Sequence, residues 1–235
     1  MAAAGNTLEQ LLSQTPEDAE ALRLLGKIRF QLSDAAGGLE LLERAAAAAP
    51  ELGAIRYELG VVLLTLGQAE QAIPRFRQSL ERQPDHPPSL FNLSWALRQQ
   101  GLDSEAIAVL RHLVGIQPDH TDAWLNLGNL QRTAHAPEAI AAYRNVLALA
   151  PDHRAAAINL AATLRLQGEF DEAASLLERV LAAHPDCADA ANNLGNILTQ
   201  TGRLDQAMDV FQSAIKFHPG DASILTNLAL AQSGH

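Results

Sequence analysis

The sequence has a single cysteine, few aromatic residues and no long apolar run. Cys187 is alone among 235 residues, which excludes a disulfide framework and a metal site built from several thiolates. Aromatic residues make up only 4% of the chain, and the abundant alanine and leucine favour helices over β-sheet. No segment approaches the roughly 18 consecutive apolar residues that indicate a membrane-spanning helix. We therefore expect an all-α protein with no membrane partner.

Basic residues are also scarce. The chain has 17 lysines and arginines against 27 aspartates and glutamates, which gives a formal net charge of -10. A general nucleic-acid binder obtains much of its affinity by neutralising phosphates, so no nucleic-acid partner is expected. The N-terminus lacks the basic start and apolar core of a signal peptide. These features predict a cytoplasmic protein.

The sequence contains no recognisable catalytic motif. It lacks a P-loop, a dinucleotide-binding fingerprint, an HExxH helix and a nucleophile elbow. His86, His120 and His153 each follow Pro-Asp, and Cys187 takes the next equivalent position. Successive positions of this kind are expected about 10 Å apart, too far to share one metal ion. The histidines are therefore interpreted as turn residues, and we expect no enzyme activity, no cofactor and no metal.

What the sequence does contain is a repeat. Seven of its eleven prolines are separated by 34 residues, with a single interval of 33. These prolines are Pro16, Pro50, Pro84, Pro118, Pro151, Pro185 and Pro219. Such regularity is the signature of a repeat architecture.

Other residue classes keep the same period. A leucine and then a small residue lie nine and ten positions after each proline, as in Leu59-Gly60 and Leu194-Gly195. A second glycine follows where a first helix would end; these glycines are Gly67, Gly101, Gly168 and Gly202. Alanines suited to a close helix crossing are Ala72, Ala106, Ala139, Ala173 and Ala207. Large apolar residues follow at Phe76, Leu110, Tyr143, Leu177 and Phe211.

Apolar residues spaced for amphipathic helices indicate two helices in each unit. The Leu-Gly pair, central alanine, late aromatic and terminal proline resemble the tetratricopeptide repeat (TPR) family. This resemblance implies a right-handed α-solenoid of helix-turn-helix repeats with a concave groove lined by the first helices. In this register, residues 1–18 contain an N-terminal capping half repeat, residues 19–221 hold six repeats, and residues 222–235 form a C-terminal half repeat. The six repeats are 19–52, 53–86, 87–120, 121–153, 154–187 and 188–221.

Three repeats depart from the pattern. Repeat four is one residue short and lacks the turn glycine, so its turn is expected to differ, with Pro137 opening the second helix. Repeat one has Ser33 in place of the turn glycine and Gly38 in place of the packing alanine. In repeat two, Pro74 lies about one turn into the second helix and is expected to distort its start.

Asparagines recur on the predicted first helices. Most lie at the sixth position, counted from the third residue after each proline, and two lie one turn later. They are Asn92, Asn126, Asn159, Asn193 and Asn227, with Asn129 and Asn196 as the later pair. An amide pairs with both the N–H and the C=O of an extended peptide. The row is similar to the asparagine ladder in the TPR arm of O-linked N-acetylglucosamine transferases, which implies an extended polypeptide in the groove.

Arginines lie three positions before the turn glycine or its equivalent. Arg98, Arg132 and Arg165 form either a basic strip beside the asparagines or a set of solvated residues complementing helix C-termini. The asparagines and these arginines are the candidate peptide-binding residues.

The C-terminal half repeat lacks a second helix. We expect Ile224, Leu225, Leu228 and Leu230 to be uncovered, which favours a truncated chain with a further domain downstream. The leading hypothesis is a non-catalytic scaffold that binds an extended polypeptide. The alternatives are a substrate-recruiting arm of a larger glycosyltransferase or sulfotransferase, and a scaffold that self-associates through its terminal helices.

Overall fold

The computed structural model describes residues 2–233, and this part of the chain is all-α, with fourteen helices and no strand. The helices are α1 (Ala2–Gln14), α2 (Ala19–Gln31), α3 (Ala35–Ala48), α4 (Gly53–Thr65), α5 (Ala69–Arg82), α6 (Pro87–Gln99), α7 (Asp103–Ile116), α8 (Thr121–Gln131), α9 (Ala136–Leu149), α10 (Arg154–Leu166), α11 (Phe170–Ala183), α12 (Ala188–Gln200), α13 (Leu204–Phe217) and α14 (Ala222–Ser233). None of these helices is long and apolar enough to cross a membrane.

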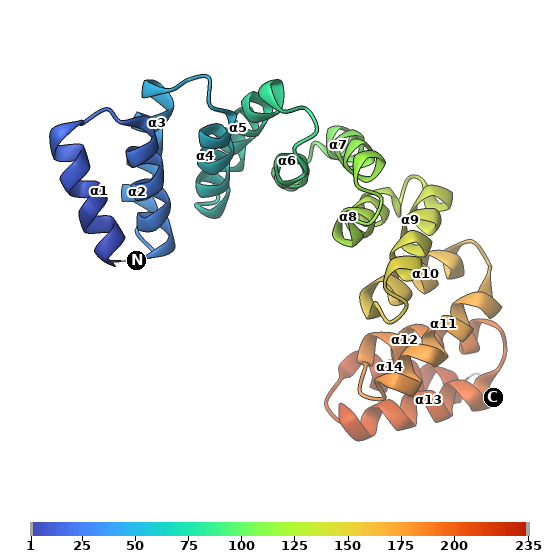
Figure 1. Cartoon of the computed structure of the whole chain (residues 1–235). Coiled ribbons are helices and arrows are strands. Elements are labelled where there is room, and N and C mark those ends of the chain that lie inside the picture. The colour runs from blue at the N-terminus through green and yellow to red at the C-terminus, as the bar shows by residue number, and fades with distance from the viewer. Residues whose placement is uncertain (1, 234–235) are drawn as a thin grey trace. The chain divides into compact units, whose positions relative to one another are not determined.

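The chain forms two compact units, residues 1–118 and 119–235. The N-terminal unit holds α1 to α7 and the C-terminal unit holds α8 to α14. In each unit a first helix packs on the following second helix, as α4 does on α5 and α12 on α13 (Figure 1). Each pair then packs on the next pair within its unit, which makes both units stacks of the α-solenoid type.

The turns between paired helices follow the glycines. Gly67, Gly101, Gly168 and Gly202 all have positive φ, between 71° and 82°, as predicted. Only glycine adopts this conformation without a steric cost. Ser33 takes the equivalent place in repeat one, also with a positive φ of 67°. Each of these turns therefore uses one left-handed residue to end its first helix.

The turn of repeat four differs, as the missing glycine predicted. Helix α8 ends at Gln131 and α9 begins at Ala136, and no residue between them has positive φ. Pro137 lies in the first turn of α9, where its missing N–H removes no helical hydrogen bond. Helix α5 continues from Ala69 to Arg82 through Pro74, so the proline does not end the helix, and a distortion of its start stays a prediction.

The core is built from the period-locked alanines and the large residues that follow them. All five of these alanines, and Phe76, Leu110, Tyr143, Leu177 and Phe211, are fully buried or nearly so. The aromatic members lie against glycines: a Cβ at Gly60 would come within 2.5 Å of the Phe76 ring, and one at Gly128 within 2.6 Å of the Tyr143 ring. The same overlap joins Gly195 to Phe211. Glycine therefore pairs with an aromatic ring across each of these crossings.

Histidines begin three of the first helices. The Nδ1 atoms of His86, His120 and His153 accept the backbone N–H three residues on, at 3.2 to 3.3 Å. These residues are therefore N-caps, which the sequence interpretation as turn residues did not specify. Cys187 begins α12 without a side-chain cap. The described residues hold no group of His, Cys, Asp or Glu side chains suited to a metal ion.

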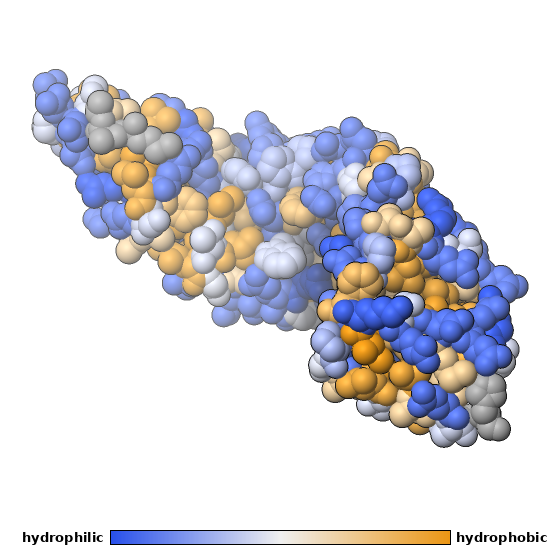
Figure 2. Space-filling view, turned by 90° about the horizontal axis from the view of Figure 1, so that it is seen from below, coloured by the Kyte–Doolittle hydropathy of each residue, from blue (hydrophilic) through white to orange (hydrophobic). Residues whose placement is uncertain are grey.

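The ends of the helical stack correct one prediction. Ile224 is fully buried, because α14 packs on α12 and α13 of the preceding repeat. Leu225 and Leu230 are 44% and 60% exposed, as expected of uncovered positions. Apolar surface of this kind is interspersed with hydrophilic side chains over both units (Figure 2). Self-association through the terminal helices stays a prediction.

Candidate functional site

The C-terminal unit carries most of the predicted asparagines. Its first helices α8, α10, α12 and α14 present six half-buried asparagine side chains, which we call the Asn face. They are Asn126, Asn129, Asn159, Asn193, Asn196 and Asn227. Asn92 lies on α6 of the N-terminal unit, where its Nδ2 donates a long hydrogen bond of 3.4 Å to the Tyr57 hydroxyl. The candidate site is therefore described within the C-terminal unit.

Hydrogen bonds join amides on successive first helices. The Nδ2 of Asn159 on α10 donates to Oδ1 of Asn129 on α8 at 2.9 Å. The Nδ2 of Asn227 on α14 donates to Oδ1 of Asn192 on α12 at 3.2 Å. Asn192 was not among the predicted site residues. Each of these bonds therefore joins side chains of neighbouring repeats.

Tyr143 supports this face from beneath. Its ring is buried against Gly128, and its hydroxyl donates to Oδ1 of Asn129 at 2.8 Å. Because Asn159 donates to the same oxygen, both acceptor positions of the Asn129 carbonyl are filled. Burial raises the pKa of Tyr143 to about 12, which the positive charge of Arg132 partly opposes. The hydroxyl therefore stays a donor, and the Asn129 amide turns its Nδ2 away from Tyr143.

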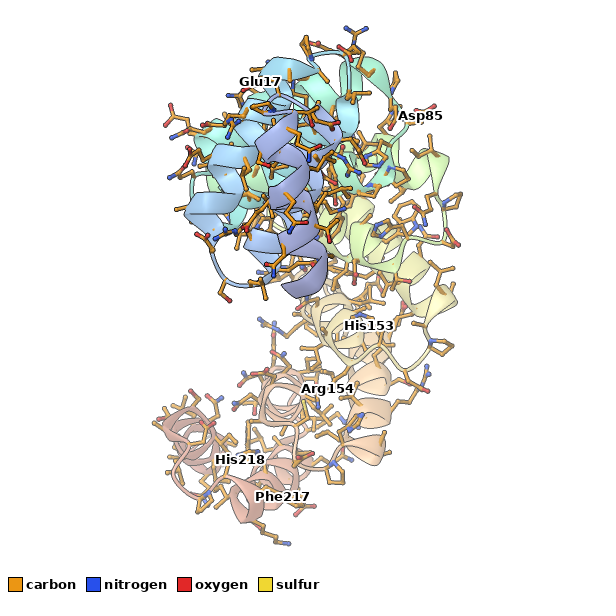
Figure 3. The ribbon with its side chains drawn as sticks, turned by 60° about the vertical axis from the view of Figure 1, so that its left-hand side comes forward. Glu17, Asp85, His153, Arg154, Phe217 and His218 are labelled. Atoms are coloured by element: carbon orange, nitrogen blue, oxygen red, sulfur yellow. The ribbon has the colours of Figure 1, made fainter. Side chains whose placement is uncertain are left out.

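The other amides of the Asn face have free hydrogen-bonding groups. Asn126, Asn193 and Asn196 make no side-chain hydrogen bond within the part of the chain that the structure describes. A cavity of about 400 Å³ opens beside Asn159, between α10 and the start of α12. Its walls include Ile158, Asp189 and Arg154, which is labelled in Figure 3. The face thus combines unused amides with a hollow lined by both apolar and charged groups.

The predicted arginines lie at the C-terminal ends of first helices. Arg98 and Arg165 are in the last turns of α6 and α10, and Arg132 follows the last residue of α8. Arg98 stacks over the Trp95 ring at 5.8 Å, and Arg165 donates to Gln200 at 3.3 Å. Positive charge is favourable at these helix ends. Their placement agrees with the helix-end interpretation, and a basic strip along the asparagines stays a prediction.

The corresponding face of the N-terminal unit has different chemistry. Glu58 on α4 accepts from Arg23 at 2.7 Å and from Lys27 at 3.0 Å, and Arg23 also pairs with Glu20 at 2.5 Å. Glu58 is only 13% exposed. The hydrogen bond and charge of Arg23 lower the pKa of Glu20, against a smaller opposing effect of burial. This face is closed by internal ion pairs.

A family model for the tetratricopeptide repeat matches most of the chain, at residues 2–52, 57–121, 129–179 and 164–222. The chain belongs to the TPR family. Many solved TPR structures share this fold. The C-terminal part of a TPR protein from Cytophaga hutchinsonii aligns over 97% of this chain and 94% of its own, with a TM-score of 0.82 and 14% identity.

Two other TPR structures align over shorter stretches. MamA from Desulfovibrio magneticus covers 72% of this chain and 97% of its own, with a TM-score of 0.66 and 19% identity. YrrB, described as a TPR protein with an unusual peptide-binding site, covers 78% of this chain and 95% of its own, with a TM-score of 0.71 and 17% identity. No curated protein sequence matches. These identities establish the fold. TPR arrays are protein-interaction scaffolds, and no catalytic family is indicated.

Proposed function

We propose that the C-terminal unit binds an extended polypeptide along the Asn face, through the peptide backbone. The observation that carries this proposal is the hydrogen bond between Asn159 and Asn129, because it brings amides of successive repeats together on one half-buried face. Asparagine amides that line a surface in this way match the alternating donors and acceptors of a peptide chain.

The two bonded amides have complementary roles toward such a ligand. Asn129 has both acceptor positions filled by Tyr143 and Asn159, so it offers its Nδ2 hydrogens to a peptide C=O. Asn159 uses one hydrogen in this contact and keeps its Oδ1 for a peptide N–H. The pair therefore contacts both kinds of backbone group without reading a side chain.

The spacing of the repeats sets how many peptide residues separate successive contacts with the Asn face. Packed helices lie about 8 to 10 Å apart, and an extended chain advances about 3.3 Å per residue. One repeat thus corresponds to about three peptide residues. The peptide-binding site of YrrB supports peptide binding as a use of this fold.

The test is a peptide-array screen followed by affinity measurements on the peptides it selects. Asn126→Ala combined with Asn193→Ala removes two amides that make no internal hydrogen bond, so stability should be unchanged. We expect affinity to fall at least tenfold for many peptides of unrelated sequence, because the lost contacts are to the backbone.

Asn145→Ala is the matched control. Asn145 is an exposed asparagine on second helix α9 whose Nδ2 donates to its own helix at Ala141. This variant should bind like the wild type. Affinity within twofold of wild type in the double variant would contradict the proposed function.

A further inference from the structure

A cavity recurs at the same place in three repeats. In each case the inter-repeat proline, the start of a first helix and one side of the second helix contribute to the wall. The cavity at Pro151 has a volume of about 140 Å³ and that at Pro185 about 280 Å³. A third, of about 180 Å³, lies at Pro50 in the N-terminal unit. Recurrence in equivalent positions shows that the repeat architecture itself creates the hollow.

The two cavities of the C-terminal unit are separate from the Asn face except at Arg154, which lines both the cavity at Pro151 and the cavity beside Asn159. The walls at Pro151 come from α9, α10 and α11, and those at Pro185 from α11, α12 and α13. None of the six Asn-face residues lines either cavity. Helix α11 contributes to both, which makes them neighbours across one repeat. We call them the basic cavity and the apolar cavity for the reasons that follow.

The basic cavity is lined by two arginines above an apolar floor. Arg154 and Arg179 line it together with one acidic residue, Asp152, so positive charge is in excess. The remaining lining includes Leu147, Leu176, Val180 and His184. Neither arginine makes a hydrogen bond or ion pair with another residue in the described part of the chain. Arginine needs several acceptors, and in this acidic chain unpaired guanidinium groups facing one cavity favour an anionic ligand group.

Only this repeat has arginine at both positions, although repeat one has Arg44 at the second of them. In the next repeat the equivalents of Arg154 and Arg179 are Ala188 and Ser213. By contrast, Arg144 on α9 is a surface arginine that is already paired with Glu172, at 2.9 Å. The arginine pair is thus absent from the apolar cavity and is not neutralised by an ion pair as Arg144 is. The cavity at Pro50 also has two arginines, Arg56 and Arg82, but Glu81 lines it with them.

The apolar cavity has the opposite character. It is lined by Leu181, Val210, Ala214 and Phe217, with Asp209 and Ser213 among its few polar residues. Phe217, at the end of α13 (Figure 3), is 52% exposed, an unusual placement for an aromatic side chain. A cavity with this lining suits a bulky apolar side chain, whose burial also covers the Phe217 ring.

We propose that this surface binds a second extended peptide segment, one that carries an anionic side chain about three residues from a bulky apolar side chain. The anionic group pairs with Arg154 and Arg179, and the apolar group enters the cavity at Pro185. The separation follows from the distance of about 10 Å between successive repeats and the rise of about 3.3 Å per extended residue. Unlike the Asn face, this surface recognises the side chains of the bound peptide.

The experiment uses the full chain and fluorescein-labelled eight-residue peptides in a Gly-Ser background. One probe carries glutamate and leucine three residues apart, a second carries phosphoserine in place of glutamate, and a third carries alanine there. We expect saturable binding of the first or second probe, at least fivefold tighter than the third. The stronger of the first two identifies the anionic group as a carboxylate or a phosphate.

Two variants locate the binding. Arg179→Gln and Phe217→Ala change exposed side chains that line only these cavities, and each should weaken binding at least fivefold. Arg154 is left intact because it also lines the cavity beside Asn159. Arg144→Gln is the matched control and should bind like the wild type.

This proposal would be overturned by the absence of saturable binding by any probe at millimolar concentration, by no preference over the alanine probe, or by affinity within twofold of wild type in Arg179→Gln. Weakened binding in Asn126→Ala/Asn193→Ala would also overturn it, since the probes would then occupy the Asn face. The two proposals therefore fail separately, because each has variants that leave the other surface unchanged.

Discussion

The first helices of the two units share a fold but differ in what they do with their polar groups. In the N-terminal unit, Glu58 is held by Arg23 and Lys27, so the charges on this face satisfy one another. In the C-terminal unit, Asn126 and Asn193 have no internal partner within the described residues. The charged groups of the first face are paired internally, whereas the second face retains amides that can bind a ligand.

This difference shows how a repeat protein confines binding to part of its length. Leu24 and Glu58 occupy the positions that Asn126, Asn159 and Asn193 occupy later in the chain. The paired helices are present in both units despite these differences, because the positions lie outside the alanine and aromatic core. A ligand at the N-terminal face would have to break existing ion pairs, whereas the C-terminal amides are available at no such cost.

The largest predicted effect tests whether both units depend on the packing of a glycine against an aromatic ring. Gly60→Ala in the N-terminal unit and Gly195→Ala in the C-terminal unit each place a Cβ inside an aromatic ring, that of Phe76 or of Phe211. Overpacking of this kind costs about 2 to 3 kcal/mol of unfolding free energy. Urea unfolding followed by circular dichroism should show a similar loss for both variants.

A second substitution should reverse that loss. Repeat five already combines Ala161 with Leu177, both fully buried, so alanine and leucine form a compatible pair. Adding Phe76→Leu or Phe211→Leu to the respective glycine variant should therefore restore much of the stability. A double variant less stable than both of its single variants would show that the match between the small residue and the large residue does not determine the stability of this helix contact.

The next prediction addresses the difference between the faces directly. Glu58→Ala leaves Lys27 unpaired and removes one partner of Arg23, which should cost about 1 to 2 kcal/mol because Glu58 is largely buried. Asn193→Ala removes a half-buried amide without an internal partner and should cost under about 0.5 kcal/mol. Denaturant unfolding of both variants measures the contrast. Equal losses would mean that the C-terminal amides are as structural as the N-terminal ion pairs.

Much of the fold was predictable because each structural requirement recurs in every repeat. The left-handed turns at Gly67 and Gly168, the buried Ala72 and the ring of Phe211 all lie where the period placed them. Ile224 was wrongly expected to be uncovered. The sequence shows that its own second helix is missing, but the cover supplied by α12 and α13 depends on tertiary packing.

The site was less predictable than the fold. The positions of the asparagines were evident, yet their mutual hydrogen bonds depend on rotamers and on distances between repeats. The support of Asn129 by Tyr143 was missed, although Tyr143 is the one tyrosine among equivalent phenylalanines and leucines. The cavities at Pro151 and Pro185 join residues of different repeats, and no short sequence spacing marks them.

The last prediction concerns this tyrosine. Tyr143→Phe keeps the ring but leaves Asn129 with one donor fewer, which should cost about 1 kcal/mol. It should also weaken peptide binding, because the Asn129 amide is then free to turn. Phe211→Tyr is the reciprocal change: it places a hydroxyl beneath Asn196 in repeat six, as Tyr143 lies beneath Asn129, and should strengthen binding.

The pH dependence separates the hydroxyl from the ring. Burial raises the pKa of Tyr143 from about 10 to about 12, so folding favours the protonated form. Its stabilising effect is complete below pH 10 and is lost as the pH rises toward 12. Unfolding curves should therefore show the deficit of Tyr143→Phe at pH 7 and a smaller deficit at pH 11. A deficit that stays constant between these values would mean that folding does not raise the pKa of the Tyr143 hydroxyl.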